Sequence, residues 1–213
     1  TLIEAELPPR ANVALLATNC ADYAVVALGC WIAGCTVTLV NARYGSQEMR
    51  HLVAVARPTL AVVGSPNDEV DRRLWRQWTS AVAEVAGSVD ELTTMGLAEL
   101  ASLRTRPVPG DVLADRLAGV RARDVAAVMF TSGTTALPKP CPIVHEALVR
   151  GAVASAGVRL RLGREDVLWD PLPMYHVSFL GLFVACGLAG VPFVSMEHFD
   201  AEAAFAQVLA TRA

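Results

Sequence analysis

Apolar and polar positions alternate along this chain in blocks that predict short buried strands separated by amphipathic helices. Residues 12–18 predict a buried strand, residues 21–32 a helix that a glycine ends, and residues 60–63 another buried strand. Between them, Ser46 is expected to cap a helix that closes at Arg57-Pro58. Strands that alternate with helices at this spacing indicate an α/β fold whose sheet is mostly parallel.

The stretch that follows predicts a helical insert. Val70, Leu74, Trp78 and Val82 form one apolar stripe at helical spacing, which favours packing against a core. Residues 104–110 contain two prolines and predict a surface connection. We therefore expect a first α/β lobe at residues 1–110, with a variable helical insert at about 64–110. A second α/β lobe is expected at residues 111–213, truncated at its C-terminal end.

Two uncharged stretches of 18 residues, Tyr23–Val40 and Phe179–Met196, reach the length of a membrane-span candidate. Each contains an Ala-Gly pair followed by a β-rich tail, which predicts a helix, a glycine stop and a short strand instead. No membrane span is therefore expected. The likeness of the two stretches suggests two lobes built from similar α/β units.

The composition indicates which classes of binding partner the chain can have. Of its 213 residues 54% are hydrophobic and 18% are charged, below the roughly 25% charge of an ordinary domain. The excess apolar surface predicts coverage by a missing C-terminal part of the same chain, and it would also allow homo-oligomers. A formal net charge of −3 offers no general attraction to nucleic acid. Five cysteines without CxxC spacing indicate reduced thiols in a cytoplasmic protein.

One lysine stands out among the 18 basic residues, because all the others are arginines. Lys139 ends the segment Phe130-Thr-Ser-Gly-Thr-Thr-Ala-Leu-Pro-Lys139, which follows a predicted buried strand at residues 125–130. Backbone amides in such a turn converge on an anion, hydroxyls add donors, and a flexible ammonium closes over phosphates. The predicted phosphate-binding residues are Thr131, Ser132, Gly133, Thr134, Thr135 and Lys139.

Other phosphate and nucleophile motifs do not fit. Pro138 and Pro140 flank Lys139, so the Gly-Lys-Ser/Thr of an ordinary P-loop NTPase is missing. The sequence also lacks a G-x-S-x-G nucleophile elbow and a GxGxxG dinucleotide turn. A small stand-alone kinase is therefore excluded.

Thr-Ser-Gly-Thr-Thr-x-x-Pro-Lys after an apolar strand resembles the phosphate-binding signature of the adenylate-forming (AMP-binding) enzyme superfamily, which includes acyl-CoA synthetases, luciferases and peptide-synthetase adenylation domains. His145 resembles the start of the helix that follows the family's loop, and Pro171-Leu-Pro-Met-Tyr-His176 resembles its Pro-Leu-Pro-aromatic-His segment. Asn19, Ala33-Gly34 and the segment Val40-Asn-Ala-Arg-Tyr44 resemble its opening unit. The likeness covers nearly the whole chain in the same order.

The resemblance implies part of the large N-terminal domain of an acyl-CoA synthetase similar to fatty-acid–CoA ligases. Such an enzyme uses ATP, Mg²⁺ and coenzyme A to activate a carboxylic acid as an acyl-adenylate and to transfer it to a thiol. Lys139 would be the catalytic residue at the leaving pyrophosphate, and Thr131 would lie by the metal. His176 and Tyr175 would line the substrate pocket. The acid itself stays open among fatty, aryl, small carboxylic and amino acids.

Two departures from the family pattern support an alternative. The family usually has Gly or Ser at the position of Ala136 and Gly at the position of Pro140, which here stiffens the loop. The chain also stops before the downstream metal site, the ribose-binding Asp and the second catalytic lysine of the family. The free-standing chain is therefore expected to lack ligase turnover. The alternative is a catalytically degenerate nucleotide-binding or protein-interaction module with the same fold.

Overall fold

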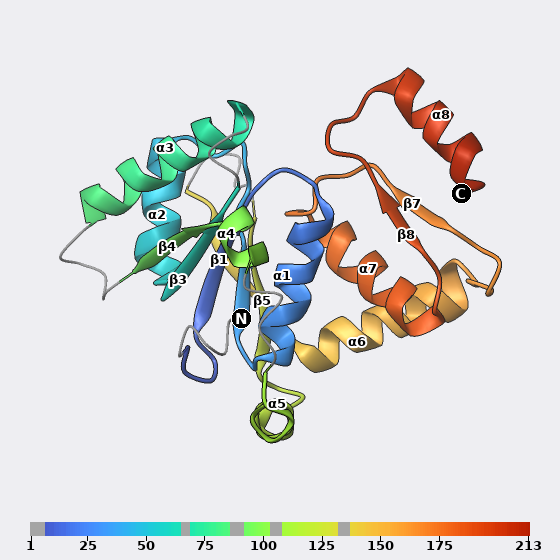
Figure 1. Cartoon of the computed structure of the whole chain (residues 1–213), viewed down its shortest axis with the longest axis horizontal. Helices are drawn as coiled ribbons and strands as arrows, with labels where there is room; N and C mark the ends of the chain where they lie inside the picture. The colour runs from blue at the N-terminus through green and yellow to red at the C-terminus, as the bar shows by residue number, and fades with distance from the viewer. Residues whose placement is uncertain (1–6, 65–68, 86–91, 103–107, 132–136) are drawn as a thin grey trace.

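The computed structural model describes residues 7–64, 69–85, 92–102, 108–131 and 137–213. Six strands in this part of the chain form one sheet in the order β4-β3-β1-β2-β5-β6 (Figure 1). Adjacent strands from β4 to β5 are parallel, and β6 is antiparallel to β5. Their bounds are Asn12–Leu16 (β1), Thr36–Leu39 (β2), Leu60–Val63 (β3), Thr93–Gly96 (β4), Val125–Thr131 (β5) and Lys139–Val144 (β6).

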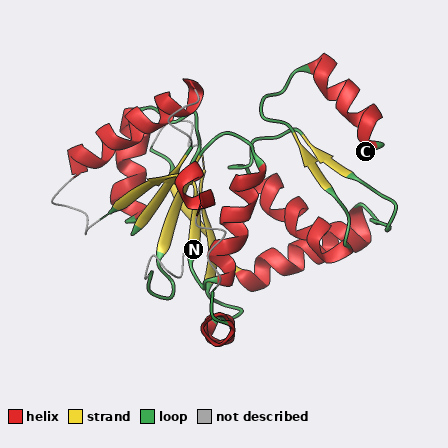
Figure 2. Ribbon diagram, in the orientation of Figure 1, coloured by secondary structure: helices red, strands yellow, loops and turns green. Residues whose placement is uncertain are grey.

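Helices cover both faces of this sheet (Figures 1 and 2). Val13 and Leu15 of β1 lie in a core with α1 (Ala21–Ile32) and α4 (Leu97–Ser102), next to which α5 (Gly110–Gly119) packs. Ala14 and Leu16 lie in the opposite core with α2 (Ser46–Ala56) and α3 (Glu69–Val85). Successive side chains of a strand point to opposite faces, so a strand buried on both sides must be apolar throughout.

The last third of the chain forms a smaller unit. In it α6 (His145–Ala154), a π-helical turn (Ser155–Arg159) and α7 (Val177–Ala189) pack together, and β7 (Leu168–Asp170) pairs with β8 (Phe193–Ser195) in a parallel two-stranded sheet. The chain ends with α8 (Ala201–Thr211), which Figure 1 shows beyond the two strands. Phe179 of α7 meets Tyr23 of α1 edge to face at 5.7 Å, which joins this unit to the first core.

The helix ends follow the sequence closely, with one exception. Gly34 and Gly190, both at φ 70°, stand just after α1 and α7, as the two Ala-Gly pairs predict. Asp200 caps α8, and its Oδ1 accepts a hydrogen bond from the Ala203 N–H at 2.8 Å. The predicted Ser46 cap is wrong, because Ser46 is the first helical residue of α2 and Gly45 occupies the cap position without a side chain to bond.

Two strands and one pairing were not predicted. Strand β4 lies inside the expected helical insert, where it pairs in parallel with β3. Strand β6 contains Pro140 and Pro142, and it stands at the edge of the sheet, where a missing N–H donor is tolerated. Strand β5 pairs with β2, so the strand before the loop belongs to the first sheet, although the sequence places it in the second lobe.

The α/β fold with a mostly parallel sheet flanked by helices is confirmed. The two sheets are unequal, with six and two strands in the described residues. The division of the chain near residue 110 stays a prediction. Among the described residues, no helix is both long enough and apolar enough to cross a membrane.

Candidate functional site

Two of the predicted site residues, Thr131 and Lys139, lie at the carboxyl edge of the main sheet. Thr131 is the last residue of β5, and Lys139 is the first residue of β6. Because β6 runs antiparallel to β5, its start lies at the same edge as the end of β5, and the two residues are register partners. Ligands of parallel α/β sheets bind at this edge, beyond the carboxyl ends of the strands.

Thr131 and Lys139 are paired where the predicted phosphate loop leaves β5 and enters β6, and this pair is called the neck of the loop. The Thr131 hydroxyl donates a hydrogen bond of 3.5 Å to the Lys139 carbonyl, and both residues are exposed. Ser132, Gly133, Thr134, Thr135 and Ala136 lie outside the described residues. Lys139 therefore lies exposed at the carboxyl edge of the sheet, where the described part of the chain resumes after the predicted phosphate loop.

Two side chains that the sequence analysis did not select contact this neck. His51 of α2 places its Nε2 2.9 Å from the Pro138 carbonyl oxygen. The Tyr44 hydroxyl donates a longer hydrogen bond, 3.4 Å, to the Phe130 carbonyl. Burial, and then the charge of Glu48, raise the pKa of Tyr44, so its hydroxyl stays protonated and able to donate.

Asn19 joins the ends of three strands. It follows β1, and its Nδ2 donates to the carbonyls of Leu172 and Met196 at 3.0 Å each and to the Ser195 hydroxyl at 3.4 Å. Its Oδ1 accepts a 2.7 Å hydrogen bond from the Met174 N–H. The Pro-Leu-Pro-Met-Tyr-His segment and the end of β8 are thus tied to the end of β1.

The two predicted pocket residues occupy different places. Tyr175 is half-buried and lines a cavity of about 730 Å³ at the carboxyl edge. His176 is exposed, and its Nδ1 accepts a 3.4 Å hydrogen bond from the Ser178 N–H at the start of α7. That contact makes His176 a helix cap, and neither this cavity nor the apolar cavity described below includes it in its lining.

The cavity beside Tyr175 carries charged and polar groups. Arg43, Arg73 and Glu197 line it, together with Asn19. Arg43 comes from the connection after β2, Arg73 from α3, Glu197 from the segment after β8 and Asn19 from the segment after β1. The two arginine side chains outnumber the Glu197 carboxylate, so the lining favours an anionic ligand.

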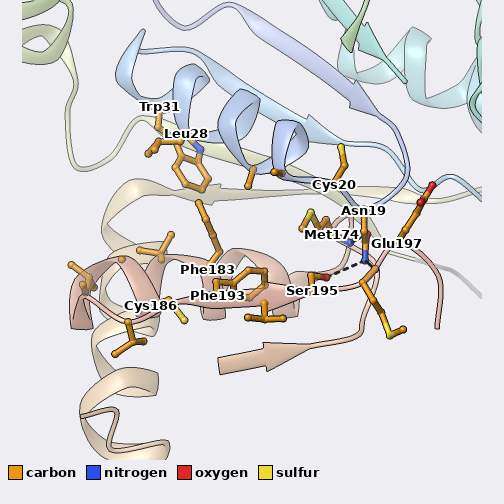
Figure 3. Close-up of a pocket in the computed structure, with 18 residues that line it drawn as sticks. Asn19, Cys20, Leu28, Trp31, Met174, Phe183, Cys186, Phe193, Ser195 and Glu197 are labelled. Atoms are coloured by element: carbon orange, nitrogen blue, oxygen red, sulfur yellow. Dashed lines mark hydrogen bonds between the residues drawn. The ribbon is translucent and has the colours of Figure 1, made fainter. Parts of the chain in front are cut away.

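A second cavity, of about 750 Å³, lies between α1, α7 and β8 (Figure 3). Its walls are mainly apolar, with Trp31, Phe183 and Phe193 as the largest side chains. Figure 3 shows Asn19 and Glu197 at the end of this cavity near the carboxyl edge. The cavity has the size and the apolar character of a site for a small organic molecule.

The donor set for a metal is sparse. The described residues contain no group of three or more His, Cys, Asp or Glu side chains that could hold an ion. Mg²⁺ accepts oxygen ligands, keeps several waters and is commonly bound through substrate phosphates. The exposed Thr131 hydroxyl fits as one oxygen ligand of a phosphate-bound Mg²⁺, and no further protein ligand is evident among the described residues.

Comparison with curated proteins gives relatives over nearly the whole chain. It is 28% identical over 202 residues to the long-chain-fatty-acid–CoA ligase FadD13 of Mycobacterium tuberculosis, covering 94% of this chain and 38% of that protein. It is 30% identical over 193 residues to 4-coumarate–CoA ligase 5 of Oryza sativa subsp. japonica, covering 89% of this chain and 34% of that protein. The chain thus spans less than half the length of these relatives.

Solved structures share the fold. The inhibitor-bound N-terminal domain of FACL13 from Mycobacterium tuberculosis matches with a TM-score of 0.73 at 24% identity, covering 99% of this chain and 50% of that one. The o-succinylbenzoate CoA synthetase MenE from Bacillus subtilis, in complex with the acyl-adenylate OSB-AMP, matches with a TM-score of 0.77 at 18% identity, covering 99% and 49%. A family profile described as AMP-binding enzyme matches residues 1–212. The chain, with its predicted phosphate loop at the carboxyl edge of an α/β sheet, belongs to the AMP-binding enzyme family.

Proposed function

We propose that the complete polypeptide that contains this chain is an ATP-dependent acyl-CoA ligase. The observation that carries the proposal is the pairing of Thr131 with Lys139, the chain's one lysine, at the carboxyl edge of the sheet. That placement supports a site in which an ammonium group meets a triphosphate. The names of the relatives, a long-chain-fatty-acid–CoA ligase and a 4-coumarate–CoA ligase, support the same chemistry.

The reaction has two steps. A carboxylate oxygen of the acid bonds to the α-phosphorus of ATP while the bond to the pyrophosphate oxygen breaks, giving acyl-adenylate and pyrophosphate. The sulfur of coenzyme A then bonds to the acyl carbon, AMP departs, and the thiol proton goes to solvent. Lys139 would offset the charge that grows on the departing pyrophosphate. Mg²⁺ would neutralise phosphate charge, with Thr131 as one of its oxygen ligands.

A lipophilic acid is the proposed substrate class. The cavity between α1, α7 and β8 is mainly apolar, with Trp31, Phe183 and Phe193 in its wall. An apolar wall favours an acid with an alkyl or aryl body over a small polar acid. Tyr175 borders the more polar cavity, and His176 at the start of α7 is proposed as a pocket residue only through the family resemblance.

The 213-residue chain alone is proposed to lack turnover, because the family's second catalytic lysine has no counterpart in a sequence with one lysine. A cytoplasmic location is proposed on the five cysteines, none of which forms a disulfide. The downstream part of the polypeptide and a second copy of this chain stay proposed partners.

Pyrophosphate exchange into ATP tests the ligase proposal. The complete polypeptide is assayed with a panel of alkyl, aryl and small polar acids. Exchange that depends on a lipophilic acid and falls about 100-fold or more in Lys139→Ala supports the proposal, because an electrostatic group at developing charge is worth that much. Arg164→Ala, which removes an exposed cation elsewhere, is the matched control. Unchanged exchange in Lys139→Ala would rule out the assigned role.

The rival proposal, a degenerate module, rests on Ala136 and Pro140. The placement of Pro140 in the edge strand β6 favours a tolerated variant, since an edge strand accommodates a missing donor. Changing both residues to Gly separates the two: a large gain in ATP binding indicates decay, and little change indicates tolerance.

A further inference from the structure

We propose that His51, assisted by Tyr44, is a positioning residue that fixes the two ends of the phosphate loop and thereby sets the place of Lys139. The inference rests on the ligase function proposed above. Its observations are two hydrogen bonds from α2 and the residues just before it. One reaches the residue before Lys139, and the other reaches the residue before Thr131.

The His51 contact is short and specific. Nε2 lies 2.9 Å from the Pro138 carbonyl oxygen, and a carbonyl can only accept. Nε2 must therefore carry the proton in this contact. Pro138 is buried, so its carbonyl has little access to water as a replacement partner. Because Pro138 C=O and Lys139 N–H belong to one peptide plane, a hydrogen bond to that carbonyl orients the backbone of Lys139.

The helix that carries His51 is itself firmly placed. Met49, Leu52 and Val53 of α2 are fully buried against the sheet, which fixes the position of the His51 backbone. Because α2 is fixed against the sheet, the hydrogen bond from the imidazole fixes the Pro138 carbonyl relative to the sheet. The residues in contact, His51 and Pro138, are 87 positions apart in the sequence.

Tyr44 holds the other end of the neck. Its hydroxyl donates 3.4 Å to the Phe130 carbonyl, a longer and weaker contact than that of His51. Its side chain is 8% exposed and lies in the same core cluster as Phe130. The neck formed by Thr131 and Lys139 is therefore contacted on one side by α2 and on the other by the connection just before α2.

Kinetics in the complete polypeptide test the positioning role. His51→Ala is expected to raise the KM for ATP about 3- to 10-fold, the effect of one lost hydrogen bond, and to leave the KM for the acid unchanged. His51→Gln, whose amide can still donate, should recover most of the loss, and Tyr44→Phe should have a smaller effect than His51→Ala. Gln47→Ala, at an exposed position of the same helix, is the control.

Several results would overturn the inference. They are equal changes in the two KM values, no rescue by Gln, or no change in His51→Ala. Each would mean that the contact does not act on the nucleotide.

A second measurement is independent of catalysis. Two-dimensional ¹H–¹⁵N NMR of the imidazole nitrogens in the 213-residue chain, which has four histidines, should find the proton of His51 on Nε2. Its resonance is assigned by its loss in His51→Gln. A neutral His51 with its proton on Nδ1 would overturn the inference. If the complete polypeptide has no exchange activity, the ligase proposal fails, and this measurement still decides whether His51 holds Pro138.

Discussion

Replacing Asn19 by alanine should loosen the junction between the two sheets. The amide side chain of Asn19 holds the carbonyls of Leu172 and Met196 at 3.0 Å each, and it accepts from the Met174 N–H at 2.7 Å. The fourth contact, 3.4 Å to the Ser195 hydroxyl, shares the same two N–H donors and adds little. Three strong hydrogen bonds are therefore lost together.

The magnitude follows from those three bonds. At about 1 kcal/mol for each net hydrogen bond, Asn19→Ala would lower the free energy of unfolding by about 3 kcal/mol. The contact to Leu172 is exposed, so water can replace it, which lowers the expected cost to about 2–3 kcal/mol. Asn19→Asp should cost at least as much, because a carboxylate keeps the acceptor for Met174 but places negative charge against two carbonyl oxygens.

Equilibrium urea unfolding of the chain, followed by tryptophan fluorescence and by circular dichroism, measures this loss. Asn41→Ala is the matched control, since Asn41 Oδ1 makes one local bond of 2.9 Å to the Arg43 N–H. The free energy of unfolding of Asn41→Ala should fall by no more than about 1 kcal/mol. If Asn19→Ala costs the same as Asn41→Ala, the idea that Asn19 joins the two units is refuted. Non-coincident transitions in the variant alone would instead indicate that the smaller unit unfolds first.

Three further predictions follow from local geometry. Gly34→Ala should destabilise the fold by about 1 kcal/mol, because Gly34 has φ 70°, whereas Gly119→Ala in α5 should be neutral or slightly stabilising in the same urea assay. Burial lowers the pKa of His145 below 6.5, against the opposing pull of Asp124. The stability that neutral His145 contributes is therefore present above pH 6.5 and lost as the pH falls through its folded pKa. In His145→Gln, the urea concentration at the unfolding midpoint should change less between pH 7.5 and 5.5 than in the unchanged chain. Gly187→Leu should fill the apolar cavity without a backbone clash, because a Cβ there meets no atom within 4 Å. Its exchange activity with long acids should drop about tenfold or more relative to short ones, and an unchanged acid profile would place the acid elsewhere.

Local sequence sufficed for much of the fold. Helix α1 begins at Ala21 and ends at Ile32, where the pattern places it, and its end is explained by Gly34, which follows the cap residue Ala33 and adopts positive φ. The same logic located α7 before Gly190. The loop before Lys139 was also visible in the sequence, since its hydroxyls, glycine and lone lysine are contiguous. These features depend on residues within a few positions of one another.

Other features of the candidate site were decided by tertiary structure. The Asn19–Met174 contact joins residues 155 positions apart, and the His51–Pro138 contact joins residues 87 apart. Neither has a local signature, because an Asn after a strand and a His on a helix are ordinary residues until another segment reaches them. Strand β4 likewise depends on its pairing with β3, because four residues with two threonines are too short to mark a strand by themselves.

The sequence by itself thus predicted most of the helices and buried strands and the two glycine stops, whereas the phosphate-binding role of the loop stays a prediction. Only the folded chain decided that β5 joins the first sheet and that β6, with two prolines, forms its edge. It also decided that α2 reaches the neck of the loop. The physical reason is that helix and turn preferences arise from neighbours along the chain, whereas strand partners and long-range hydrogen bonds depend on how the whole chain packs.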